Sequence, residues 1–192
     1  MNQDPASQIP ANNFNFGFYI KDGFTMVKEN PVPFLIGNLI LMLINMLTMG
    51  VLVGHWYAGI YAMVNKLKKG ETIEIGDAFA GFNDFIPNLA AGIVFSLCVG
   101  IASLFCIIPA FIVGGILFYL IPLVALRKET ISNAIKISKN EAMKELVNHI
   151  LFFLIVSVIS FAGTILCGVG VFLTFPIGVA AMASVYEDRL GK

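Results

Sequence analysis

The sequence predicts an all-α fold: a polytopic membrane helix bundle of about six spans, arranged as three helical hairpins that each follow an interfacial amphipathic helix. Three observations predict it. Of the 192 residues, 58% are hydrophobic and only 12% are charged, about half the charge of an ordinary soluble domain. The charged residues avoid three long windows, and a similar short segment precedes each window. These features exclude a nucleic-acid binder, a secreted disulfide scaffold and a disordered chain.

The three windows, residues 30–65, 85–126 and 146–186, contain no Asp, Glu, Lys or Arg. The second and third have 42 and 41 residues, twice the roughly 20 that one spanning helix needs. Each therefore predicts a helical hairpin, because backbone groups in lipid must be paired internally. Pro or paired Gly predict the turns around 106–109 and 167–170. The first window is shorter, and its expected turn near 48–50 leaves two helices close to the lower length limit.

Charge placement predicts the orientation. With six spans, all twelve Lys and Arg residues lie on one side of the membrane, and the positive-inside rule places that side and both termini in the cytoplasm. The outer turns hold no charge, which leaves two alternatives. Either the hairpins cross fully with tight outer turns, or one or more of them dip into the membrane and return as wedges. We expect crossing, and the first, shorter window is where a wedge competes most strongly.

The chain divides into a tail and one domain. Residues 1–17 have no basic start and no apolar core, which predicts a short flexible cytoplasmic tail rather than a cleaved signal. Residues 18–192 are expected to form a single integral membrane domain. Within it Phe24, Phe79 and Ile135 occupy similar places, 55 and 56 residues apart. This spacing predicts three repeat units, about 18–70, 73–128 and 129–188, each an interfacial helix followed by a hairpin.

Two local signals concern the segments that connect the hairpins. Asp77 is expected as the N-cap of a short amphipathic helix. Ser138 followed by Glu141 fits a capping box, which predicts that a new helix starts there and runs into the fifth span. We interpret these segments as ordinary juxtamembrane packing. Binding to anionic lipid is the alternative, and the near balance of acidic and basic residues speaks against it.

Small residues at four-residue spacing mark the surfaces through which the spans are expected to pack, because close backbone approach drives helix association in lipid. Replacing Gly54 by Leu is expected to push two helices apart. The predicted helix-packing residues on the second and third spans are Gly50, Gly54, Ala58, Ala62, Gly92, Ser96 and Gly100.

Polar groups at membrane depth are few. The absence of Asp, Glu, Lys and Arg there argues against ion-coupled transporters, pumps and voltage sensors. The candidate lining of a narrow polar path is Asn38, Asn45, His55 and Asn88, although hydrogen bonding between helices is the commoner use of such side chains. His149, at the start of the fifth span, is expected to be structural.

No catalytic constellation is found, so we do not expect an enzyme. A nucleophile elbow, a phosphate loop and a suitably placed pair of carboxylates are all missing from the sequence. Two histidines without a nearby carboxylate or thiol cluster make a poor metal site. Cys98, Cys106 and Cys167 have no paired spacing. We therefore expect no metal and no cofactor.

Several short motifs carry a resemblance to a known family. They lie at residues 70–71, 78–82, 106–109, 134–138, 167–170 and 174–177. Through them, residues 28–188 resemble the small prokaryotic multi-pass membrane proteins of unknown function that look related to the membrane domain preceding some glycerophosphodiester phosphodiesterases. Ala110 stands where that family usually has Gly. The resemblance implies the cytoplasmic (inner) membrane of a prokaryote. No phosphodiesterase domain is attached, so no catalytic residue is carried over.

The function expected from these features is that of a non-enzymatic integral membrane protein that organises lipid or a protein partner through helix packing. Its expected partners are membrane lipids and either a second copy or another membrane protein, with no nucleic acid. One alternative is a small transporter or channel for an apolar or amphiphilic solute, which requires a mid-membrane cavity that gathers the candidate polar lining. A second alternative is a membrane-shaping hairpin protein.

Overall fold

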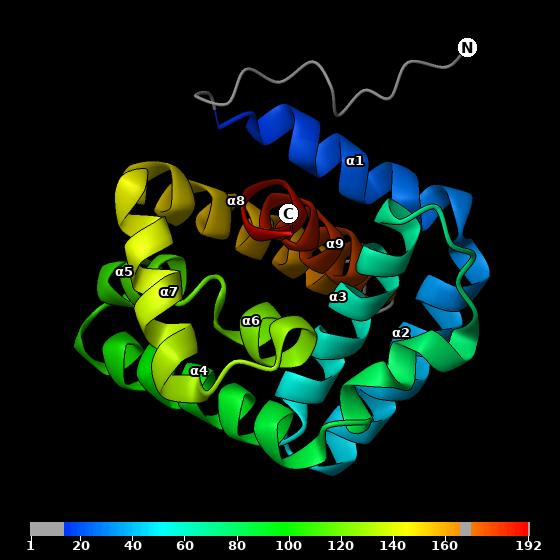
Figure 1. Ribbon diagram of the computed structural model, residues 1–192, viewed down its shortest axis with the longest axis horizontal. Coiled ribbons are helices and arrows are strands. Elements are labelled where there is room, and N and C mark those ends of the chain that lie inside the picture. The colour runs from blue at the N-terminus through cyan, green and yellow to red at the C-terminus, as the bar shows by residue number, and fades with distance from the viewer. Residues whose placement is uncertain (1–13, 166–169, 192) are drawn as a thin grey trace.

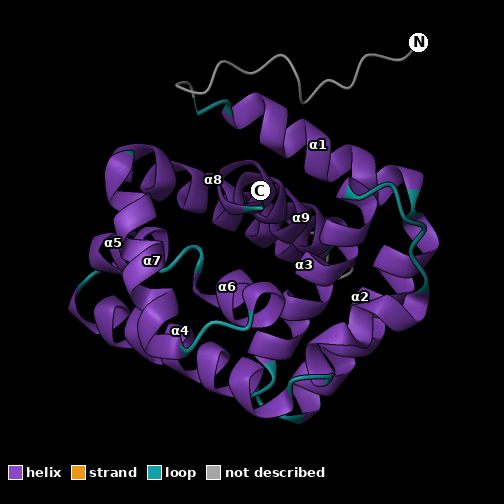
Figure 2. Ribbon diagram, viewed as in Figure 1, coloured by secondary structure: helices purple, strands orange, loops and turns teal. Residues whose placement is uncertain are grey.

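The computed structural model describes residues 14–165 and 170–191, which fold into helices with no strand among them (Figures 1 and 2). The all-α prediction is confirmed for this part of the chain. In chain order the helices are α1 (Phe16–Glu29), α2 (Pro31–Leu47), α3 (Val53–Lys68), the 3-10 helix η2 (Ile75–Phe82), α4 (Phe85–Phe105), α5 (Ile107–Ile116), α6 (Leu120–Arg127), α7 (Ile131–Lys144), α8 (Leu146–Ile165) and α9 (Val171–Leu190).

Four helical stretches of the described chain are long and apolar enough to cross a membrane. They are α4, the stretch Ile107–Arg127 that contains α5 and α6, α8 as far as Gly163, and α9. The pair α1 and α2, which bends by 95°, is a fifth candidate. Singly, α2 has 17 residues and α3 has 16. By length and composition, four or five helices of the described chain could span a membrane, which supports a membrane protein. The six predicted spans are not confirmed.

Helix α9 is the centre of the bundle. Every residue from Pro176 to Tyr186 is buried, and α9 packs against α1, α3 and α8. In Figure 1, α1 runs along the top edge and α4 along the bottom edge, with α9 and α3 between them. Helices α4, α8 and α9 each contain an apolar 18-residue window, and the share of that window that is buried is 61% in α9 but only 17% in α4 and 22% in α8. Helices α4 and α8 therefore present most of their apolar surface outward, as helices that face lipid do.

The turn between α2 and α3 occupies residues 48–52, at the predicted place. Met49 and Gly50 have positive φ angles of 52° and 81°, and the Gly50 N–H donates to the Asn45 carbonyl at 2.7 Å. Glycine suits such a left-handed position because it has no Cβ. The break between α4 and α5 falls at Cys106, inside the predicted turn. The third predicted turn, residues 167–170, lies outside the described residues except for Gly170.

One break was not predicted. Helix α5 ends at Ile116 and α6 begins at Leu120, which divides a span-length stretch in two. Pro122 has no N–H to donate to the carbonyl four residues earlier, so the helix is weakened at this point. Ser138 of α7 bonds to two other backbone groups at this break: its hydroxyl donates to the Ile116 carbonyl at 2.7 Å and accepts from the Tyr119 N–H at 3.1 Å. The break is therefore stabilised by a side chain from the neighbouring helix.

The connecting segments correct two predictions. Asp77 is not the N-cap of its helix: Glu74 is, and Asp77 completes a capping box by accepting from the Glu74 N–H at 2.8 Å. The prediction that a helix starts at Ser138 is also wrong. Helix α7 runs through Ser138 without interruption and ends at Lys144, because the next residue, Glu145, has a non-helical φ of −141°. Ser138 is wholly buried, so its hydroxyl serves the α5–α6 break instead of a helix end.

Of the predicted tail, residues 1–17, the structure describes only residues 14–17. Helix α1 begins at Phe16, and the Asn15 side chain caps it by accepting from the N–H of the third residue on, at 3.0 Å. Phe14 is only 8% exposed. Its ring lies edge-on to His149 and Phe152, with ring centroids 5.2 and 5.4 Å away. The aromatic residues of this segment thus belong to the core.

Candidate functional site

The charged residues of the described chain lie at the ends of helices and in the segments that connect them, and ion pairs join several of these elements. We call the surface that they form the charged face. It comprises α1, the connection from α3 to α4, the connection from α6 to α8, and the end of α9. No charged residue lies in the long apolar segments between them. The ion pairs that join two different elements here include Lys68–Asp22 at 2.6 Å, Lys66–Asp77 at 2.7 Å and Lys128–Asp84.

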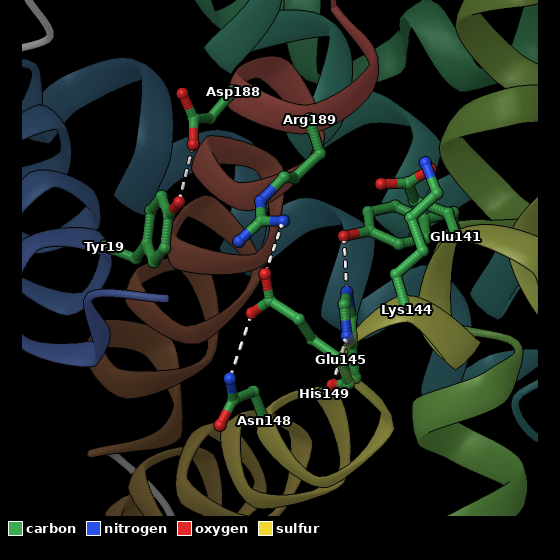
Figure 3. A network of polar contacts seen from close by, with 9 residues as sticks. Tyr19, Glu141, Lys144, Glu145, Asn148, His149, Asp188 and Arg189 are labelled. Carbon is green, nitrogen blue, oxygen red and sulfur yellow. Dashed lines mark hydrogen bonds and ion pairs between the residues drawn. The ribbon is translucent and has the colours of Figure 1, made fainter. Parts of the chain in front are cut away.

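A polar network joins α1, α8 and α9 at the charged face (Figure 3). Arg189 near the end of α9 donates to one oxygen of Glu145 at 3.0 Å. Asn148 donates to the other oxygen of that carboxylate at 3.0 Å. Close by, the Tyr19 hydroxyl of α1 donates to Asp188 at 2.6 Å. These contacts hold the first and last helices of the chain together with the start of the fifth predicted span.

His149 extends this network into the core. The ring is 1% exposed, and Nδ1 lies 3.0 Å from the Glu145 carbonyl oxygen. A carbonyl only accepts, so Nδ1 carries the proton and Nε2 accepts from the Tyr119 hydroxyl, 2.7 Å away. Nε2 thus connects α8 to the α5–α6 break, while Nδ1 bonds to the residue that precedes α8. This arrangement is structural, and it leaves no lone pair for a metal or a substrate.

Two carboxyl groups of the charged face have lowered pKa values. Burial on its own raises the pKa of Glu145, but the hydrogen bonds from Arg189 and Asn148 outweigh it, so the pKa lies below its ordinary value. The same balance acts at Asp77, where burial is opposed by Lys66 and by the Glu74 N–H, and its pKa is also lowered. Both groups are therefore held ionised as parts of structural contacts.

Asn38, one of the four candidate lining residues, joins three helices. It is 2% exposed on α2. Its amide donates to the Phe172 carbonyl of α9 at 3.1 Å, and its carbonyl accepts from the Trp56 indole of α3 at 2.8 Å. The side chain is therefore committed to helix contacts on both sides.

Asn88 and His55 lie together where η2 and the start of α4 meet α3. Asn88 donates to the Gly81 carbonyl at 2.7 Å, and His55 Nε2 lies 3.0 Å from the Phe85 carbonyl. The His55 ring stacks on Phe82 with centroids 4.8 Å apart. Asn88 Oδ1 and His55 Nδ1 are buried without a hydrogen-bond partner among the described residues. Both side chains connect segments of the protein to one another.

Asn45, the fourth candidate, donates to its own helix at the Leu41 carbonyl, 3.0 Å away, and its Oδ1 is buried without a partner in the described chain. None of the four candidates lines the cavities described below. The structure thus brings Asn88 and His55 together but does not gather the four around a shared opening.

Among the predicted helix-packing residues, Gly54 and Gly92 form the closest approach between α3 and α4. A Cβ at Gly54 would overlap the Asn88 backbone and lie 2.9 Å from the Gly92 Cα. A Cβ at Gly92 would lie 2.6 Å from the Gly54 Cα. Ala58 is 1% exposed and Ala62 is half-buried on the same helix. Only glycine at both positions allows the two backbones to come this close.

Three of the predicted packing residues do not pack within this chain. Gly50 is the left-handed turn residue between α2 and α3, and no atom of the described residues lies within 4 Å of the point that a Cβ there would occupy. Gly100 has the same open surroundings on α4, and Ser96 one turn before it is exposed. The four-residue spacing is real, but beyond Gly92 helix α4 leaves α3 and turns this face outward.

The described surface has three notable cavities. One, of about 450 Å³, lies at the charged face between the start of α4 and the α6–α7 connection, and we call it the charged-face pocket. A second, of about 320 Å³, lies among α3, α8 and α9. The third, of about 500 Å³, is a wholly apolar groove between α5 and α8. Only the first combines an apolar floor with charged side chains.

The described residues do not meet the requirements of a metal site or of a cysteine pair. Its residues include no group of three or more His, Cys, Asp or Glu side chains that could hold a metal ion. Cys98 and Cys106 are exposed and free, and Cys167 lies outside the described residues. Both described cysteines face outward from α4 and its end.

No family model matches this chain, and no curated protein and no solved structure is significantly similar to it. The resemblance to the small prokaryotic multi-pass membrane proteins therefore stays a prediction. Any function has to be inferred from the geometry of the chain itself.

Sequence reasoning missed the residues that organise the charged face. Tyr19 and Asp188 are 169 positions apart, and neither carries a local signal. Ser138 did carry one, because it falls between Ala134 and Ala142 at four-residue spacing on the buried side of α7. A buried hydroxyl on such a face needs a hydrogen-bond partner. Backbone groups inside an intact helix are already paired, so this need is a signal of a break in a neighbouring helix.

Proposed function

We propose that this chain is a non-enzymatic integral membrane protein that organises lipid, and that its first hairpin is a wedge that ends inside the bilayer. The observation that carries the proposal is the apolar tip of that hairpin. Leu47 is 87% exposed and Met49 is 93% exposed, on a turn without any charge. Such side chains favour hydrocarbon over water by roughly 1.5–3 kcal/mol each when fully transferred. A tip of this composition belongs in lipid.

Helix length supports the wedge. Lys66 and Lys68 in the last turn of α3 stay at the charged face. The apolar part of α3 therefore runs from Val53 to Asn65, which is about 20 Å at 1.5 Å per residue. Helix α2 with 17 residues is about 25 Å long. Both are shorter than the hydrocarbon core of about 30 Å, so the tip ends about 5–10 Å short of the far boundary.

The other two hairpins are long enough to cross. Helix α4 with 21 residues is about 31 Å long, and the Ile107–Arg127 stretch has the same number of residues. Helices α8 and α9 have 20 residues each, and residues 146–186, which hold all of their apolar parts and the connection between them, carry no charge over 41 residues. We propose that these form two crossing hairpins and that the charged face, which carries the basic residues, lies in the cytoplasm with both termini.

The fate of the buried polar groups supports a structural role over transport or catalysis. Asn38 bonds to two neighbouring helices, and both ring nitrogens of His149 are bonded within the protein. The cavity between α5 and α8 has an apolar lining that suits acyl chains. The outward face of α4 around Ser96 and Gly100 also presents small residues to the bilayer. Lipid is the partner that matches these surfaces.

Purification in a mild detergent followed by native mass spectrometry tests the proposal. We expect phospholipid to remain bound after extensive washing, because the apolar tips and grooves need acyl chains around them. A strictly monomeric species that carries neither lipid nor another protein would contradict the proposal. Activity against phosphodiester or ester substrates in the same preparation would contradict the non-enzymatic part.

A further inference from the structure

We propose that the charged-face pocket binds the headgroup of a zwitterionic phospholipid that carries a primary ammonium, of the phosphoethanolamine type. This inference rests on the proposed function and names the class of lipid that the protein holds. The pocket has a volume of about 450 Å³, within the range of small-molecule sites. Asp84, Lys128 and Glu129 form its charged rim, and Ala90 and Val124 lie among its apolar lining.

The pocket lies at the depth of lipid headgroups. Asp84 immediately precedes α4, and Lys128 immediately follows α6, so both stand at the charged ends of span-length helices. Val124 is one turn inside, about 6 Å along the axis from Lys128. Ala90 is about 9 Å along the axis from Asp84. The cavity thus extends from the charged rim into the first apolar turns, a distance that matches the headgroup layer on one side of a bilayer.

The rim carries both signs of charge. Lys128 pairs with Asp84, and their side chains are 58% and 33% exposed, so a ligand can reach both. The third charged group is Glu129, which accepts from Asn133. An exposed ion pair of this kind contributes little to stability, so it can open without a large penalty. A lipid phosphate can then take Lys128 while the lipid ammonium takes Asp84 and Glu129.

The balance of the rim selects between headgroups. One cation faces two carboxylates, so an anionic headgroup without an ammonium would meet net repulsion. A quaternary ammonium has no N–H to donate, whereas a primary ammonium has three and forms charge-assisted hydrogen bonds with carboxylates. Below the rim, Val124 is buried and Ala90 is half-buried, and this apolar floor accepts the upper part of an acyl chain. A primary-ammonium phospholipid satisfies every part of the lining.

Lys128 is held in position by the backbone. It caps α6 in the left-handed conformation, with φ 57° and ψ 30°. The next residue, Glu129, donates its N–H back to the Leu123 carbonyl at 3.2 Å. Thr130 then starts α7 by accepting from the Asn133 N–H. This tight connection aims Lys128 and Glu129 at the same opening, which pre-organises the rim for a ligand with two opposite charges.

The test is a lipid titration of the full-length protein in detergent, read by native mass spectrometry, with phosphatidylethanolamine, phosphatidylcholine and phosphatidylglycerol of identical acyl chains. We expect phosphatidylethanolamine to bind at least tenfold more tightly than the other two. Asp84→Asn should reduce that preference to less than threefold, because it removes a carboxylate that receives the ammonium. Lys128→Gln should weaken the binding of all three lipids, because they share the phosphate that Lys128 binds. Ala90→Phe fills the floor without altering the charges and should weaken all binding at this site. Lys136→Gln, on the exposed side of α7, is the matched control and should keep the preference.

Equal affinity of the wild type for the three lipids overturns the inference. An unchanged preference in Asp84→Asn, or unchanged affinities in Lys128→Gln, overturns it as well when the variant retains wild-type thermal stability. In these cases lipid is still retained and the proposed function stands. A wild-type protein that retains no lipid of any class removes the proposed function as well, so the two failures are distinguishable.

Discussion

The close contact between α3 and α4 allows a prediction with a definite sign. Replacing Gly54 by Ala adds a methyl group that would overlap the Asn88 backbone and lie 2.9 Å from the Gly92 Cα, whereas ordinary contacts begin at 3.4 Å. Both neighbours are backbone atoms, so the two helices must move apart. A gap of about 0.5–1 Å forfeits a quarter to a half of the dispersion attraction across the contact.

The magnitude follows from two opposing effects. Overpacking a core contact costs about 1–3 kcal/mol, and the second backbone clash at Asn88 places Gly54→Ala toward the upper end. Against this, Ala is favoured over Gly within a helix by about 1 kcal/mol. We expect a net destabilisation of about 1–2 kcal/mol, and a larger one for Leu at the same position.

The matched control is Gly100→Ala on α4, where a Cβ would meet nothing within 4 Å among the described residues. Only the difference in helix propensity acts there, so this variant should be neutral or more stable by up to about 1 kcal/mol. Thermal unfolding in one detergent, followed by circular dichroism, measures both variants. Equal stability of the two would refute the reasoning, and so would a stabilised Gly54→Ala.

Three further predictions concern the α5–α6 break, the charged face and the membrane. Ser138→Ala removes two buried hydrogen bonds and should lower the free energy of unfolding by about 1–3 kcal/mol. The control Ser157→Ala loses only a bond within its own helix and should lower it by about 0.5 kcal/mol. An equal loss in the two variants would contradict the role of Ser138. The lowered pKa of Glu145 means that its contact with Arg189 stabilises the fold above the ordinary carboxyl pKa of about 4.5 and is lost as the pH falls through the folded value. The thermal unfolding temperature of the wild type should therefore fall more steeply below pH 4.5 than that of Glu145→Gln. If the two unfolding temperatures fall in parallel with pH, the contact between Glu145 and Arg189 does not contribute to stability. Reconstitution at increasing protein density should reduce the mean diameter of liposomes, because a hairpin that ends inside the bilayer occupies more area in one leaflet than in the other. An unchanged distribution of diameters, measured by cryo-electron microscopy, would exclude membrane shaping.

The helices and the charge distribution could be predicted because they follow from local composition. Windows without charge can be satisfied only by helices in lipid, and the turns at 48–52 and Cys106 followed from glycine and proline nearby. The depth of the first hairpin in the bilayer was harder to predict, because it depends on where Lys66 lies along α3 and on how many apolar residues precede it. The contact of Gly54 with Gly92 was anticipated only as two separate small-residue faces.

The polar network was out of reach for a different reason. Glu145 and Arg189 are 44 positions apart, and Tyr19 meets Asp188 only because α1 packs along α9. Such pairs depend on tertiary arrangement, which one sequence does not encode in any short pattern. Conversely, Ser96 and Gly100 show that a correct local pattern can point outward once the helix diverges from its neighbour.

The depth of the first hairpin in the bilayer is the most direct test of the proposed wedge. Single cysteines at Met49 and Ser103, in a variant that lacks Cys98, Cys106 and Cys167, can carry a fluorophore whose depth is measured with lipids spin-labelled at known positions. We expect the Met49 label about 5–10 Å inside the far hydrocarbon boundary and the Ser103 label, near the end of the longer α4, at that boundary. Equal depths, with both labels at the far surface, would show that the first hairpin crosses and would contradict the wedge.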